Sequence, residues 1–101
     1  MLLHLVLFRF TPGTSAERIA QARDALLSLS GRIPEIRRIR WGPNLGPSSD
    51  EYPFAFQVWF DSMDAVQVYL DHPLHRRTVA EQVAEIREAR LAVDVEADGA
   101  G

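Results

Sequence analysis

A tyrosine and two histidines stand close together in the segment YLDHPLH, residues 69–75, and could transfer protons. An imidazole has an ordinary pKa of about 6.5 and exchanges a proton near neutrality, whereas a phenol, at about 10, donates a hydrogen bond or a proton. An enolisation or aldol step needs a base at an acidic carbon and a donor at the oxyanion that develops. Tyr69 as donor and His75 as base would supply both roles. The alternative is structural: Tyr69 packs in the core, and His75 caps a helix or holds a loop.

His72 immediately precedes Pro73, which places it at the start of a new helix. Proline at the first helical position pushes the preceding residue toward an extended backbone, where an N-cap residue sits. We therefore expect His72 to cap this helix. His72 and His75 are three residues apart and share a helix face, but Asp71 is the one carboxylate close by. Two histidines without an inward carboxylate make a poor metal site, so no metal is predicted.

The third histidine, His4, lies on an apolar segment between Leu3 and Leu5. A polar ring in such surroundings is expected to be buried and hydrogen-bonded. A single buried histidine of this kind would have a structural role. If it shares a cavity with His75, it becomes an orienting partner of the acid/base pair.

Alternating and helical hydrophobic patterns predict the elements that would position these side chains. The predicted strands span residues 2–10, 35–42, 52–60 and 89–96. The predicted helices run from Ser15, as N-cap, to Gly31, from residue 61 or 62 to Tyr69, and over residues 73–87. The order β-α-β-β-α-β is that of a ferredoxin-like α+β fold, in which helices cover one face of a four-stranded antiparallel sheet. Residues 1–96 would form one domain, and residues 97–101 a flexible tail.

Apolar residues of the predicted strands would form the sheet side of a cavity under the helices. These residues are Phe8, Phe54, Phe56 and Val58, with His72 at the chain break near the cavity. Such a pocket would be apolar and suited to an aromatic or acyl compound. The alternative is that the phenylalanines fill the space as ordinary core.

The opposite face of the sheet carries too much apolar surface to stay in water. It is predicted to hold Leu3, Leu5, Leu7, Ala55, Trp41 and Trp59. A symmetric dimer in which two sheets face each other on the Leu5 side would cover it, with Trp41 and Trp59 as interface anchors.

Composition excludes several classes of protein. With 47% hydrophobic and 25% charged residues the chain reads as globular, and its net charge of −3 gives no basic surface for nucleic acid. No apolar run approaches the ~20 residues of a membrane helix. The chain has no cysteine, which excludes disulfides and fits a cytoplasmic protein.

Several motifs occur in the order and spacing of a known family. They are HLVLFRFTPGT at 4–14, IP at 33–34, WGPNL at 41–45, FDS at 60–62 and YLDHPLH at 69–75. Through them the chain resembles the stress-responsive A/B barrel (Dabb) family over nearly its whole length. The resemblance implies a dimeric α+β barrel, built from two ferredoxin-like subunits, with a small cavity in each.

The resemblance also implies a chemistry for the histidines. Olivetolic acid cyclase, a plant member of the family, closes a polyketide by aldol condensation without metal or organic cofactor. Its Tyr and His acid/base pair matches Tyr69 and His75, and its first-strand histidine matches His4. It has a further cavity histidine where this chain has Phe54.

The expected function is therefore a homodimer that binds or transforms an aromatic or polyketide-like metabolite without a cofactor. The alternatives are a non-catalytic stress-responsive dimer and a cofactor-free monooxygenase of the α+β barrel type.

Overall fold

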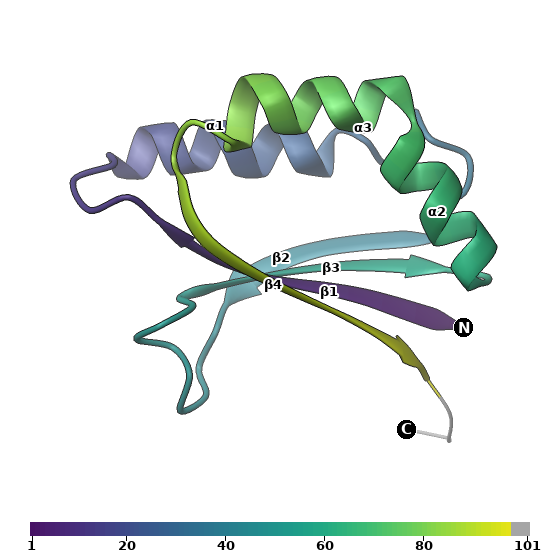
Figure 1. Cartoon of the computed structure of the whole chain (residues 1–101), viewed down its shortest axis with the longest axis horizontal. Helices are drawn as coiled ribbons and strands as arrows, with labels where there is room; N and C mark the ends of the chain where they lie inside the picture. The colour runs from purple at the N-terminus through teal and green to yellow at the C-terminus, as the bar shows by residue number, and fades with distance from the viewer. Residues whose placement is uncertain (98–101) are drawn as a thin grey trace.

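A computed structural model of the chain describes residues 1–97 (Figure 1). Its elements are β1 (Leu2–Phe10), α1 (Ala16–Leu27), β2 (Arg38–Pro43), β3 (Phe54–Phe60), α2 (Met63–Asp71), α3 (Pro73–Thr78), a π-helical turn η1 (Val79–Val83) and β4 (Arg87–Glu96). The strands form one antiparallel sheet in the order β2-β3-β1-β4. This is the predicted ferredoxin-like α+β fold.

The helices lie together on one face of the sheet and leave the other face bare (Figure 1). Along β1 every second residue, from Leu2 to Phe10, is buried against the helices. The core therefore lies between the helical layer and the inner face of the sheet. Its fully buried members include Leu29 near the end of α1, Val58 and Phe60 on β3, and Val66 on α2.

The helices begin at side-chain caps that the sequence predicts. The Ser15 hydroxyl accepts a hydrogen bond from the Arg18 amide, and the Ser62 hydroxyl accepts one from Ala65. Such caps satisfy amides that have no partner within the helix. After α1 the chain turns at Gly31, whose φ of +80° is a conformation that glycine adopts without strain.

The last predicted helix and strand meet earlier than expected. The helix predicted over residues 73–87 ends in the π-helical turn Val79–Val83, where the Ala84 amide donates to the Val79 carbonyl at 2.8 Å. Strand β4 then begins at Arg87 rather than at residue 89. Strand β2 begins at Arg38, three residues after the predicted start.

The prediction that Trp41 anchors an interface on the outer face is wrong. Trp41 lies opposite Phe56 in the β2–β3 pairing, on the face that the helices cover. Its ring stacks on Phe8 and Phe10, with centroids 6.0 and 6.3 Å apart. Alternation within a strand separates two faces but does not say which meets the helices; the register with neighbouring strands decides that.

The outer face of the sheet is apolar, as predicted. Leu91, Val93 and Val95 of β4 are 45, 40 and 45% exposed there. Across the register they lie beside Leu7, Leu5 and Leu3, and Trp59 pairs with Leu3 from the other side. No helix within residues 1–97 is long and apolar enough to cross a membrane.

The predicted tail lies outside the described residues except for its first member. Ala97 donates a backbone hydrogen bond to the Met1 carbonyl at 2.9 Å, which extends the pairing of β4 with the start of the chain.

Candidate active site between the sheet and the helices

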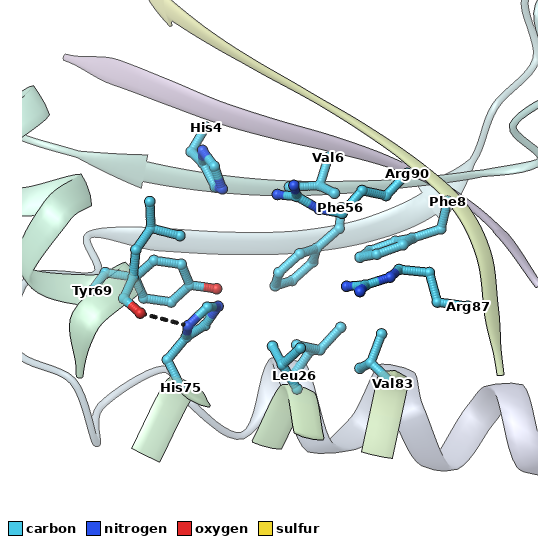
Figure 2. A pocket seen from close by; sticks show the side chains of 12 residues that line it. His4, Val6, Phe8, Leu26, Phe56, Tyr69, His75, Val83, Arg87 and Arg90 are labelled. Carbon is cyan, nitrogen blue, oxygen red and sulfur yellow. Dashed lines mark hydrogen bonds between the residues drawn. The ribbon is translucent and has the colours of Figure 1, made fainter. Parts of the chain in front are cut away.

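A cavity of about 100 Å³ lies between the inner face of the sheet and the helical layer (Figure 2). Its lining is mainly apolar, with a polar group of Tyr69 and two histidines at one end and two arginines elsewhere. The lining residues are His4, Val6, Phe8, Leu26, Phe56, Tyr69, Leu70, His75, Val79, Val83, Arg87 and Arg90.

The break between α2 and α3 positions two of these side chains. At the break His72 has an extended backbone, with φ −61° and ψ 130°, and Pro73 is the first residue of α3. The His72 Nδ1 accepts a hydrogen bond from the Leu74 amide at 3.1 Å, which confirms its predicted capping role. Because the chain changes direction here, His75 on the first turn of α3 comes to lie beside Tyr69 on the last turn of α2.

Tyr69 and His75 are in direct contact in the pocket. Their ring centroids are 4.3 Å apart, and Tyr69 is only 1% exposed. Figure 2 shows the Tyr69 hydroxyl pointing into the cavity next to the His75 ring. Within residues 1–97 this hydroxyl has no hydrogen-bond partner. Burial raises the pKa of Tyr69, partly opposed by the positive charge of Arg90, so the phenol stays protonated.

A backbone contact fixes the tautomer of neutral His75. Its Nδ1 lies 3.2 Å from the Leu70 carbonyl oxygen. Because a carbonyl can only accept, Nδ1 carries the hydrogen, and Nε2 of the neutral ring is free to accept a proton. Burial lowers the pKa of His75, and the positive charges of His4 and Arg90 lower it further. The hydrogen bond to the Leu70 carbonyl raises this pKa and so opposes part of the shift. The ring is therefore neutral near pH 7, with its basic nitrogen toward the pocket (Figure 2).

His4 reaches the same end of the cavity from β1. It is 3% exposed, and its ring centroid lies 6.1 Å from that of Tyr69. Its Nδ1 donates to the Asp94 carboxylate at 2.7 Å, across the β1–β4 register. The buried ring is therefore hydrogen-bonded through Nδ1, as expected, and its Nε2 is the nitrogen available to the cavity.

The predicted pocket residues separate into two groups. Phe8 and Phe56 line the cavity, whereas Phe54, Val58 and His72 lie outside its lining. Phe54 packs instead on Phe10 and Trp41, with centroids 5.6 Å away in both cases. Phe54 therefore does not fill the pocket.

Arg87 and Arg90 were not predicted as pocket residues. The sequence pattern predicts Arg87 at the end of the helix over residues 73–87, and a regular strand would put residues 87 and 90 on opposite faces. A register shift between Arg9 and Phe10 brings both to the inner face, opposite Phe10 and Phe8. No local sequence signal marks this irregularity.

Within residues 1–97 no group of three or more histidine, cysteine, aspartate or glutamate side chains is arranged to hold a metal ion. His72 is turned to its own helix start, and His75 to the cavity.

Comparisons with known proteins identify the family and the fold. The sequence model of the stress responsive A/B barrel domain matches residues 2–97. The uncharacterized protein SCO4036 of Streptomyces coelicolor is 33% identical over 82 residues, which cover 79% of this chain and 84% of that protein.

Two solved structures illustrate the range of similar folds. A dimeric ferredoxin-like protein of unknown function from Thermobifida fusca is 32% identical, with a TM-score of 0.78 over 93% of this chain and 88% of its own. Hydroxynitrile lyase from Passiflora edulis is 20% identical, with a TM-score of 0.84 over 99% and 95%. At this level of identity the similarity to the Passiflora enzyme shows a shared fold and nothing about function.

Proposed function

Because the chain belongs to the stress-responsive A/B barrel family, over residues 2–97, we propose that it is a homodimer whose inner pocket binds a small metabolite and transforms it by proton transfer. His75 acts as the base, Tyr69 as the hydrogen-bond donor to the developing oxyanion, and His4 as an orienting partner. The proposed steps use only side chains of this chain.

The observation that carries the proposal is the Tyr69 hydroxyl. Tyr69 as a residue is 1% exposed, yet its hydroxyl has no hydrogen-bond partner among residues 1–97 and opens into the cavity beside the free nitrogen of His75. Buried hydroxyls in a purely structural role normally have a partner. A donor left free next to a base is the arrangement that an enolisable carbonyl compound would complete.

The proposed step is the removal of a proton from a carbon next to a carbonyl. The His75 Nε2 takes the proton, and the electrons of the C–H bond move into an enolate. The enolate oxygen accepts a hydrogen bond from the Tyr69 hydroxyl. Return of the proton from His75 to another carbon of the enolate completes an isomerisation. In an aldol step the enolate carbon instead attacks a second carbonyl, and the proton held by His75 goes to the alkoxide that forms there.

The cavity volume restricts the metabolite. At about 100 Å³ it is smaller than an engineered cavity of about 150 Å³ that holds benzene. A short acyl chain, or one ring that protrudes toward the mouth, is therefore favoured over a bicyclic polyketide. The name of the Passiflora hydroxynitrile lyase indicates that this fold also occurs in a lyase.

Hydrogen–deuterium exchange tests this function without knowledge of the natural substrate. Small ketones, aldehydes and keto acids in D2O would be followed by proton NMR for loss of the signal next to the carbonyl. The wild type should exchange at least one of them faster than His75→Ala at the same protein concentration. Equal rates for both proteins across the panel would refute a catalytic His75 and leave the non-catalytic dimer.

We also propose that the outer face of the sheet forms the dimer interface. The related Thermobifida fusca structure is dimeric, and the exposed row Leu91, Val93 and Val95 needs an apolar cover. Sedimentation should give twice the chain mass of 11.4 kDa. Val93→Glu should give monomers, whereas Leu45→Glu, on a loop side chain that is 89% exposed, should not. A wild-type monomer at micromolar concentration would contradict the interface.

A further inference from the structure

We propose that Arg87 and Arg90 form an anion-binding end of the pocket, and that the small molecule taken there is a carboxylate. This inference rests on the proposed function, because it names the class of molecule that the same pocket accepts.

A β-bulge puts the two arginines on the same face of β4. Arg90 lies opposite Phe8 and Arg87 opposite Phe10, with the register shift between Arg9 and Phe10. Residues 87 and 90 are three apart, yet both line the cavity. Figure 2 shows the Arg87 guanidinium directed into the cavity beside Phe8, and the Arg90 side chain running along the sheet in the direction of His4. Bulges are frequent beside functional sites because they turn a side chain to the other face of a strand.

The two guanidinium groups lack a negative partner in the described part of the chain. Neither makes a salt bridge or a hydrogen bond within residues 1–97. The nearest carboxylates along β4 are engaged elsewhere: Glu88 pairs with Arg9 at 3.2 Å, and Asp94 with His4 at 2.7 Å. Two positive charges, from the half-buried Arg87 and the exposed Arg90, thus line a pocket that contains no carboxylate, in a chain whose net charge is −3. A bound anion would neutralise them.

The charge of Arg90 also reaches the proton-transfer end of the pocket. It lowers the pKa of both Tyr69 and His75. An anion bound to the arginines would lie in the same electrostatic field as the acid/base pair.

Guanidinium geometry and pocket size together favour a carboxylate. The planar guanidinium fork matches both carboxylate and phosphate oxygens. Apart from His4, Tyr69 and His75 the remaining lining is apolar, and the volume is about 100 Å³, which suits a short acyl chain ending in a carboxylate. With its carboxylate at the arginines, such a molecule would extend its other carbons toward Tyr69 and His75 (Figure 2).

The test measures binding of small probes by NMR titration. Butyrate is compared with butyramide, which has the same shape without the charge, and with inorganic phosphate. The proteins are the wild type, the double variant Arg87→Gln/Arg90→Gln, and Arg77→Gln as a matched control. Arg77 is exposed on α3, outside the pocket lining. Melting curves verify that each variant folds.

Butyrate should bind the wild type and Arg77→Gln equally, and at least about tenfold more weakly to the double variant, as expected for loss of a charge-assisted contact. Butyramide should bind the wild type as weakly as butyrate binds the double variant. The ring signals of Tyr69 and His75 should move when butyrate binds.

Three results would overturn the inference: equal binding of butyrate and butyramide, equal binding to wild type and double variant, or no binding of butyrate. Tighter binding of phosphate than of butyrate would also overturn it, since the site would then select phosphate. If both probes move the Tyr69 and His75 signals equally, the pocket binds ligands without help from the arginines, and the inference about the arginines is overturned. Deuterium exchange decides the proposed function separately.

Discussion

Replacing Tyr69 by phenylalanine separates the catalytic interpretation from the structural one. The substitution keeps the buried ring, which contacts His75, His4 and Phe60, and removes only the hydroxyl. A buried hydrogen bond of ordinary strength contributes about 1 kcal/mol, and a loss of that size lowers the melting temperature of a chain this long by about 4–8 °C. Because the hydroxyl has no partner within residues 1–97, we expect a change well below that.

The same substitution should have a large effect on turnover. Removal of one oxyanion donor typically lowers the rate by about 10²–10³-fold. We therefore expect Tyr69→Phe to melt like the wild type and to lose nearly all deuterium exchange into an accepted carbonyl compound.

Two controls define the scale for Tyr69→Phe. Tyr69→Ala removes the packed ring and should cost about 3–5 kcal/mol, the usual range for truncating a buried aromatic residue. Tyr52→Phe removes a hydroxyl outside the pocket lining and should leave exchange unchanged. If Tyr69→Phe melts at least about 4 °C below the wild type, the hydroxyl has a structural partner and the reasoning fails.

Two further predictions concern the histidines of the helix break. His72→Ala should destabilise the fold by about 1 kcal/mol in urea unfolding, because the Leu74 amide loses its cap. His72→Asn should recover most of this lost stability. An unchanged unfolding midpoint for His72→Ala would contradict the capping role. Burial lowers the pKa of His75 in the folded protein, so between that pKa and about 6.5 the unfolded chain binds more protons. Stability should therefore fall as the pH drops below about 6.5, and less steeply in His75→Gln; identical pH profiles would contradict this.

Local chemistry made much of the fold predictable. The alternation of β1 and the serine caps of α1 and α2 depend on neighbouring residues only, so the sequence alone predicts them. The same is true of His72, because Pro73 restricts the backbone before it. The contact between Tyr69 and His75 follows from that break, which is why both could be assigned to one site.

Non-local geometry accounts for what the sequence did not predict. Trp41 was assigned to the wrong face because register, and not alternation, sets which side meets the helices. The pairing of His4 with Asp94 joins residues 90 positions apart. Arg87 and Arg90 reach the pocket through a register shift that no residue pattern marks.

The protonation of His75 is the measurement that tests the central claim most directly. A long-range proton–nitrogen correlation spectrum at about pH 7 distinguishes a ring protonated on Nδ1, on Nε2 or on both. The hydrogen bond to the Leu70 carbonyl and the lowered pKa predict a neutral ring with its hydrogen on Nδ1. A ring that carries a hydrogen on Nε2 at that pH could not accept a proton from the pocket and would contradict His75 as the base.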